Sequence, residues 1–266
     1  MDSVDAEDIL SDALEFIGGG KADFEENLSY GPITVTTAPK EGKANTLLAD
    51  HIFSPALLLA ERIERGLFPV SGRSMIELGA GAALPSLVAA IQQRPPSLVV
   101  ATDYPDELIL SNLRCNIAQN SVHVSSACTL HVQGYEWGLD VASLLQPPLL
   151  PPDGYDIVVL SDLLHFDQSH GVLLHSLLAL LSRTPTARAY VGAGIYTRAS
   201  HYRSFLRKAE SAGLMWLESG EGEDGRETDT TWRGGLPIRG VDTGGLGERK
   251  GMCRWWIAGW APQSLT

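Results

Sequence analysis

The chain has 266 residues, of which 44% are hydrophobic, and a formal net charge of −12. This length and apolar content suffice for one sizeable core, and no linker-like stretch divides the sequence into balanced halves. The acidic balance argues against general binding to nucleic acid or to an anionic membrane, because either would require a clustered basic face.

The three cysteines are widely spaced and form no CxxC or Cys/His cluster, so we expect neither a disulfide framework nor a metal site. The first residues are acidic and lack the basic and apolar regions of a signal peptide. No apolar run approaches the length of a membrane span. We therefore expect a cytoplasmic protein with neither nucleic acid nor a membrane as a partner.

The N-terminal part predicts a helix and a short strand. Residues 5–17 carry apolar side chains at helical spacing and are followed by three glycines, and residues 33–37 are β-branched. Ser54-Pro55 predicts the start of a helix that ends at Arg65. We expect residues 1–45 to form an N-terminal extension and residues 46–266 to form a single globular domain.

From Ser74 onward, short apolar runs alternate with helical patterns. The runs that predict strands are 75–78, 98–102, 129–132, 157–161 and 189–193. The patterns that predict helices are 84–93, 107–120, 169–181 and 202–212. Such alternation with nearly continuous apolar strands indicates an α/β fold, a doubly wound, mostly parallel sheet that is covered on both faces.

The C-terminal part predicts two further strands, 214–218 and 253–260, with no helix between them. They are expected to pair as an antiparallel hairpin at one edge of the sheet, which brings the sheet to seven strands. The Gly-rich, charged stretch 219–251 is expected to be a mobile loop, and a lid over a substrate is the alternative for it.

The strongest local signal is Glu77-Leu-Gly79-Ala-Gly81, where a strand runs into a glycine turn and then into a helix that Pro85 can open. Glycines permit a sharp turn and a close approach of a ligand to the backbone. A dinucleotide site requires GxGxxG, and the third glycine is missing here. S-adenosylmethionine has no phosphates, so the pattern favours this cofactor over a dinucleotide or a plain structural turn.

Two carboxylates follow later strands. Asp103 ends the second strand of the alternating region, where an acid can accept hydrogen bonds from both ribose hydroxyls; a helix cap is its alternative role. Asp162 follows the strand 157–161, so Ser161 and Asp162 are expected to face a cleft. Asp162 is the candidate catalytic residue, which orients an amine or accepts its proton, with His165 and Tyr196 as weaker candidates. Trp137 is either a base-stacking residue or a core residue.

Together these motifs resemble the seven-β-strand class I methyltransferases. The similarity rests on Glu77–Ser86, Thr102–Asp106, Gly134–Gly138 and Leu160–Asp162, in that order, and spans residues 45–260. Within that class the chain is similar to the fungal nicotinamide N-methyltransferase-like branch, which is related to the lysine and N-terminal methyltransferases that act on elongation factor 1-alpha.

The resemblance implies a Rossmann-like fold and S-adenosylmethionine as cofactor. The cofactor contacts that it implies lie at Phe53, Glu77, Gly79, Ala80, Gly81, Asp103, Tyr104, Trp137 and Ser161. Phe53 stands where relatives have a tryptophan. The Asp-x-x-Tyr motif of many relatives is also absent, because His165 stands at the tyrosine position after Asp162.

The function predicted from these observations is an S-adenosylmethionine-dependent N-methyltransferase that methylates a lysine or N-terminal amine of a protein, with a translation factor as a candidate substrate. Two alternatives stay open. One is methylation of a small, nicotinamide-like amine, and the other is a non-catalytic module that binds the cofactor. The substrate does not follow from the resemblance, because the cleft edge at residues 193–197 differs from that of the elongation-factor enzymes.

Overall fold

The computed structural model describes residues 27–146, 153–239 and 243–265. Within this part of the chain, a seven-stranded sheet has the order β5-β4-β3-β6-β7-β10-β8. Only β10 runs antiparallel to its neighbours, β7 and β8. The strand bounds are β3 Ser74–Leu78, β4 Leu98–Asp103, β5 Thr129–Gly134, β6 Ile157–Ser161, β7 Arg188–Gly194, β8 Leu214–Ser219 and β10 Cys253–Trp260. This confirms the predicted α/β sheet and its antiparallel edge hairpin.

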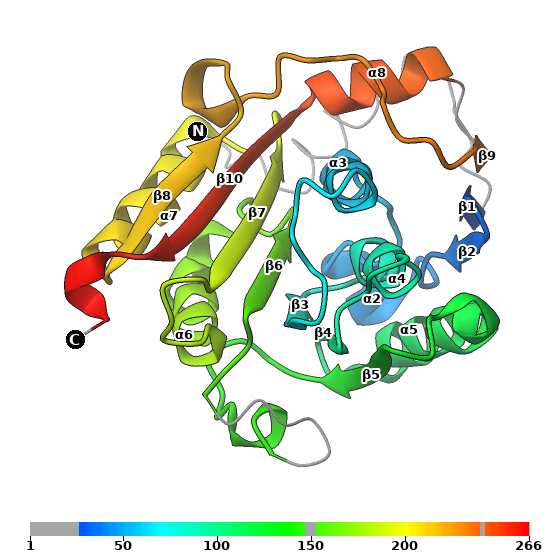
Figure 1. Ribbon diagram of the computed structural model, residues 1–266, viewed down its shortest axis with the longest axis horizontal. Helices are drawn as coiled ribbons and strands as arrows, with labels where there is room; N and C mark the ends of the chain where they lie inside the picture. Colours follow the sequence, from blue (N-terminus) through cyan, green and yellow to red (C-terminus); the bar gives the residue numbers. More distant parts are fainter. Residues whose placement is uncertain (1–26, 147–152, 240–242, 266) are drawn as a thin grey trace.

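Helices cover both faces of this sheet (Figure 1). α3, α4 and α5 lie on one face, and α6 and α7 lie on the other. Their bounds are Ser54–Glu64, Leu84–Ala90, Glu107–Asn120, His170–Leu180 and Ala199–Ser211. Short 3-10 helices are Ser121–His123, Ala142–Leu144, Asp167–Ser169, Glu223–Gly225 and Pro262–Ser264. The helices predicted at 107–120 and 54–65 therefore match closely, whereas α4 ends three residues before the predicted Gln93.

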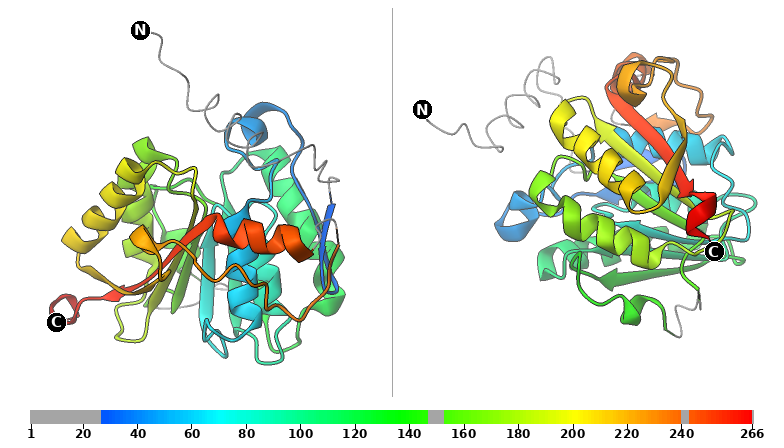
Figure 2. Two further views of the ribbon diagram at one scale, coloured as in Figure 1. Left: turned by 90° about the horizontal axis from the view of Figure 1, so that it is seen from above. Right: turned by 90° about the vertical axis from the view of Figure 1, so that its left-hand side faces the viewer.

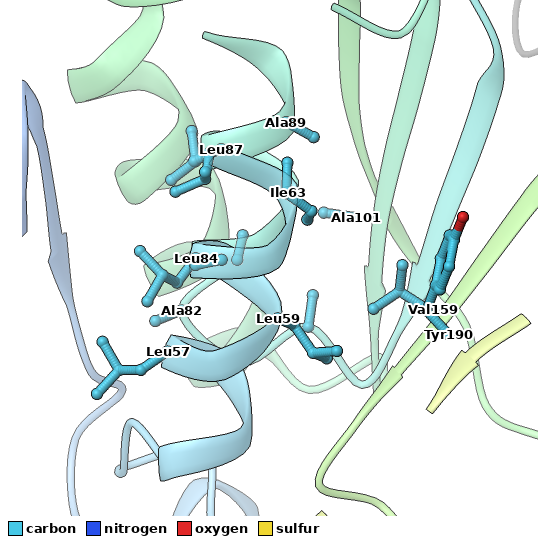
Figure 3. Packing of buried hydrophobic residues seen from close by; sticks show 14 of the residues in the cluster. Leu57, Leu59, Ile63, Ala82, Leu84, Leu87, Ala89, Ala101, Val159 and Tyr190 are labelled. Atoms are coloured by element: carbon cyan, nitrogen blue, oxygen red, sulfur yellow. The ribbon is translucent and has the colours of Figure 1, made fainter. Parts of the chain in front are cut away.

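Alternation along the strands divides the core into two clusters. On β3, Met75 packs with the α3 and α4 side, whereas Ile76 packs with the α6 and α7 side. Figure 3 shows the first cluster, in which Leu59 of α3 points toward the sheet and Leu57 points away from it. Both are buried, and a second, small sheet contributes Leu28, Tyr30, Ile33 and Val35 to the same cluster.

The small sheet has the order β2-β1-β9, with bounds Ile33–Thr36, Asn27–Tyr30 and Ile238–Arg239. An asparagine ladder on α5, defined here as Asn112, Asn116 and Asn120, holds its β2 edge. Asn120 accepts from the Thr34 backbone N–H at 2.9 Å and donates to the Thr34 carbonyl at 2.7 Å. Asn116 does the same at Thr36, at 2.9 and 2.8 Å. Side-chain amides on a helix thus replace the missing neighbour of an edge strand.

The segment after β8 follows the outside of α3 (Figure 2). We call residues 226–239 the strap; it runs from β10, where the Glu227 N–H donates to the Cys253 carbonyl at 2.9 Å, to β1, which pairs with β9. The helix α8, Thr243–Gly251, follows the strap and precedes β10, so the prediction of no helix between β8 and β10 is wrong. The predicted mobility of residues 219–251 stays a prediction.

Two further predictions need comment. The helix predicted at residues 5–17 lies outside the described residues. The predicted strand 33–37 is β2, but its partner β1 and the five-residue helix α2, Gly42–Thr46, were not predicted. None of the helices in the described part of the chain is long and apolar enough to cross a membrane.

Candidate active site

A cavity lies at the carboxyl ends of β3, β4 and β6. The chain leaves β3 toward β4 and β5 on one side of the sheet, whereas β6 and β7 lie on the other side, so this is a topological switch point. Of the residues predicted for the site, only Glu77 and the weaker candidate Tyr196 do not line the cavity. Those that line it are Phe53, Gly79, Ala80, Gly81, Asp103, Tyr104, Trp137, Ser161, Asp162 and His165. Their individual roles stay predictions.

The glycine turn between β3 and α4 needs left-handed backbone at Gly79 and Gly81, where φ is 61° and 51°. A Cβ on Gly79 would lie 2.8 Å from a methyl carbon of Leu163 and 3.1 Å from the Trp137 ring. A Cβ on Gly81 would meet nothing within 4 Å. The first glycine therefore permits close packing, and the second leaves open space above the turn where a ligand can approach the backbone.

Glu77 supports this turn from behind. Its side chain is fully buried and accepts hydrogen bonds from the Ser86 hydroxyl and, at 3.1 Å, from the Ser86 N–H. Burial raises the pKa of Glu77 to about 8, against the opposing hydrogen bonds from Ser86. The structure thus places Glu77 away from the cavity, where it joins the end of β3 to the first turn of α4 instead of contacting a cofactor.

Asp103 faces the cavity at the end of β4. One carboxylate oxygen accepts from the Gly81 N–H at 2.7 Å and the other accepts from its neighbour Tyr104 N–H at 2.7 Å. The residue is only 8% exposed, and burial raises its pKa to about 6. A carboxylate fixed in this way is suited to accept hydrogen bonds from the vicinal hydroxyls of a ribose.

Aromatic rings form much of the wall. Trp137 and Phe166 meet edge-on with centroids 6.0 Å apart. Phe53, immediately before α3, lies with its ring centroid 6.4 Å from that of His165 and 6.1 Å from that of Tyr196. Sequence analysis did not identify His51 or Phe166, both of which line the cavity; their positions before α3 and after β6 follow no motif.

Asp162 occupies a strained turn after β6, with φ at 63°. Its Oδ1 accepts from the Gly194 N–H at 2.9 Å and its Oδ2 accepts from the Tyr196 hydroxyl. The side chain is 3% exposed, and burial raises its pKa despite the opposing effects of His165 and these hydrogen bonds. Backbone strain of this kind persists where the surrounding structure fixes it, and it often marks a functional site.

The nearby histidine and acid residues do not gather as metal ligands. His170 Nε2 lies 2.9 Å from the Leu164 carbonyl oxygen, and Asp167 lies 3.7 Å from His201. The described residues contain no group of three or more His, Cys, Asp or Glu side chains that could hold a metal ion. These contacts place His170 and Asp167 in the packing of α6 and α7.

Comparison with protein families shows a match of residues 40–212 to a model described as lysine methyltransferase. The chain is 30% identical over 184 residues to a protein N-terminal and lysine N-methyltransferase, efm7, of Schizosaccharomyces pombe, covering 67% of this chain and 68% of that protein. A protein of the same name from Gibberella zeae is 35% identical over 152 residues, covering 54% and 56%. The chain thus spans just over half the length of the latter relative.

Solved structures of low sequence identity also match the chain. SMU.776, a putative methyltransferase complexed with SAH, gives a TM-score of 0.48 at 13% identity and covers 78% of this chain and 50% of its own. A methyltransferase from Pyrococcus furiosus gives 0.48 at 13% identity, covering 76% and 81%.

Proposed function

The chain belongs to the lysine methyltransferase family and is an S-adenosylmethionine-dependent methyltransferase; from that premise we propose that its methyl acceptor is an amine of a protein, either a lysine side chain or an N-terminus. One cavity that joins the glycine turn and Asp103 to the aromatic groups around Asp162 carries the proposal. It offers a place for the cofactor at one end and for a nucleophile at the other.

The residues present fit this cofactor. Space above Gly81 leaves the turn open, and Asp103 is positioned to hold the ribose hydroxyls. Trp137 and Tyr104 supply aromatic surface on which an adenine ring can pack. S-adenosylmethionine supplies a sulfonium-bound methyl group that a neutral amine can attack in line.

The chain's own contribution to such a transfer is orientation and exclusion of water. Phe53, His165 and Tyr196 surround the neighbourhood of Asp162 with rings, which favour the aliphatic stem of a lysine and its cationic head. The acidic net charge of the chain also suits a basic protein segment as partner. We propose a translation factor, elongation factor 1-alpha, as the first protein to test, and the cytoplasm as the site of action.

A second candidate acceptor is a small aromatic amine of the nicotinamide type. The ring contacts of Phe53 with His165 and Tyr196 are the observation that favours it, because such walls also suit a flat base. The two candidates differ in the size of the acceptor and not in the cofactor.

Calorimetric titration with S-adenosylhomocysteine tests the cofactor end. We expect Gly79→Ala to weaken binding at least tenfold, because its Cβ would displace Leu163 and Trp137. Gly72→Ala is the matched control, because Gly72 also has a positive φ, of 69°. A Cβ on Gly72 would meet nothing within 4 Å, and the residue does not line the cavity. Equal binding by both variants would contradict the placement of the cofactor at this turn.

Transfer from methyl-labelled S-adenosylmethionine tests the acceptor end. Purified elongation factor 1-alpha and nicotinamide are offered separately, and mass spectrometry locates the added methyl group. We expect label on a lysine or the N-terminus of the protein. Label on nicotinamide alone would select the second candidate, and cofactor binding without transfer to either would contradict both acceptors.

A further inference from the structure

Among the described residues that line the cavity, His165 is the one with buried side-chain polar atoms that lack a hydrogen-bond partner, and this holds for both ring nitrogens. Both nitrogens are also shielded from solvent. The residue lines the cavity and its ring lies against Phe166, with centroids 3.9 Å apart. A buried polar atom without a partner costs free energy, and a catalytic role is one of the recognised reasons for such an atom in a folded protein.

Asp162, by contrast, already has donors on both carboxylate oxygens, from Gly194 and Tyr196. Gly194 makes this possible, because a Cβ there would collide with the Tyr196 ring. The carboxylate is therefore held in place from the β7 side, and it shares its negative charge with two protein donors. His165 therefore offers an incoming ammonium a basic nitrogen without a hydrogen-bond partner, whereas each carboxylate oxygen of Asp162 already accepts a hydrogen bond from the protein.

The charged and titratable groups around His165 come from three elements. Burial of the His165 ring and the neighbouring His201 of α7 oppose protonation of the ring and lower its pKa. Asp162, directly after β6, opposes this shift through its negative charge and through the polar groups of its backbone. The net effect is that the pKa of His165 is lowered. His201 is itself 3.7 Å from Asp167, and Tyr196, after β7, donates its hydroxyl to Asp162. The resting imidazole is thus neutral at pH 7 and has a free lone pair.

We propose that His165 accepts the proton of the substrate ammonium before methyl transfer, and that Asp162 is a positioning residue that stabilises the resulting imidazolium. In this step an N–H bond of the ammonium breaks and the proton binds a ring nitrogen of His165. The neutral amine then forms an N–C bond with the methyl group as the S–C bond breaks, and the sulfonium becomes a thioether. The imidazolium later releases its proton to water. This inference rests on the proposed function.

A purely structural role for His165 as an aromatic wall is the competing explanation, and His165→Phe separates the two. This substitution keeps a planar ring beside Phe53 and Phe166 but removes the acceptor. We expect kcat to fall about 100-fold at pH 7 with KM little changed, since general base catalysis contributes 10²- to 10⁴-fold. Binding of S-adenosylhomocysteine should be unchanged. His175→Gln, on the exposed side of α6, is the control expected to retain full activity.

The pH profile gives a second signature. The kcat of the wild type should fall only below pH 6.5, where His165 becomes protonated. Burial lowers the pKa of His165 from its ordinary value of 6.5. In His165→Phe the rate should rise about tenfold per pH unit toward the pKa of a free lysine, about 10.4. The deficit of the variant should therefore shrink as pH rises. A wild-type rate and profile in His165→Phe would overturn the inference even though methylation itself is established.

A measurement without turnover distinguishes failure of this inference from failure of the proposed function. In the complex with S-adenosylhomocysteine, the ring resonances of the histidines are followed by NMR while n-butylamine is added, and His165 is assigned by its absence from His165→Phe. We expect the amine to shift the His165 resonances toward those of the protonated ring and to leave exposed His123 unchanged. No amine-dependent change at His165 would overturn the inference, whether or not any protein is methylated.

Discussion

Two groups of buried carboxylates in this molecule are stabilised in different ways. On the outer side of α3, Glu61 is fully buried but lies 3.1 Å from Lys250 and 3.6 Å from Arg65. At the glycine turn, Glu77 and Asp103 are also buried, yet neither has a cation within ion-pair distance in the described structure. Their donors are hydroxyl and backbone N–H groups, and burial raises the pKa of both.

This difference separates a region that holds the fold together from the region that we propose binds the cofactor. On the outer side of α3, Glu61 accepts from the strap at Arg233 N–H and pairs with Lys250 of α8, so its charge is compensated within the chain. Around the turn, charge compensation is incomplete, which costs stability and leaves Asp103 able to accept further hydrogen bonds. The two regions should therefore respond with opposite signs when a charge is removed.

The largest effect is expected from Lys250→Met, which leaves Glu61 buried without its nearest cation. Breaking a buried ion pair in this way costs about 3–5 kcal/mol, and Arg65 at 3.6 Å makes the lower end of this range the expectation. Urea unfolding followed by circular dichroism measures the loss. The double variant Glu61→Gln/Lys250→Met should recover much of it.

The matched control for this change is Arg233→Ala. The Arg233 backbone N–H, and not its side chain, donates to Glu61 at 2.6 Å, and the side chain is 55% exposed beside Asp229. We expect a loss of at most about 1 kcal/mol, as for other exposed ion pairs. An equal loss in Lys250→Met would show that the buried pair contributes no more than a surface pair.

The opposite sign is expected for Glu77→Gln. The folded protein holds the Glu77 proton up to about pH 8, whereas the unfolded chain releases it near pH 4.5, so the unfolding free energy of the wild type falls as pH rises between these values. The variant lacks this slope. Relative to the wild type it should gain about 2–3 kcal/mol between pH 5 and pH 8, measured by urea titrations at several pH values. Parallel pH curves for the two proteins would contradict the raised pKa.

A smaller effect than those of Lys250→Met and Glu77→Gln is expected for Asp103→Asn, and it is an effect on cofactor affinity. The variant should bind S-adenosylhomocysteine about tenfold more weakly at pH 8, equivalent to about 1.4 kcal/mol. The wild-type affinity should fall as pH drops through about 6, where Asp103 takes up a proton, and the variant should show no such fall. Calorimetry at pH 5 and pH 8 measures both. An unchanged affinity in the variant would remove Asp103 from the cofactor site.

The sequence brings most of the cavity lining together correctly because its signals are local. Gly79, Gly81 and Asp103 lie within 25 residues, and strand periodicity places them at one edge of a parallel sheet. The local pattern does not indicate the direction in which each side chain points. Glu77 precedes the glycines in the chain, but strand alternation turns its carboxylate toward Ser86 and away from the cavity.

The region around α3 is hard to predict for the opposite reason. Glu61 and Lys250 are 189 residues apart, so no spacing rule connects them. The sequence of α8, with glycines at 244, 245, 247 and 251, has poor helix propensity, and burial of Leu246 and Lys250 stabilises it instead. The contact of Tyr196 with Asp162 is likewise long-range, and it depends on the missing side chain of Gly194.

The asparagine ladder on α5 has a consequence for self-association. Two residues of an extended strand advance about 6.6 Å and four residues of a helix advance about 6.0 Å, so rungs at Asn116 and Asn120 match Thr36 and Thr34. The rungs bond the backbone N–H and carbonyl groups of both threonines, and these bonds do not depend on the side chains of β2. The Thr36 hydroxyl adds to them by donating to Asn112 and Asn116 at 2.9 Å. The β2 edge of the small sheet thus resists recruitment into intermolecular β-structure, which an unpaired edge strand would invite.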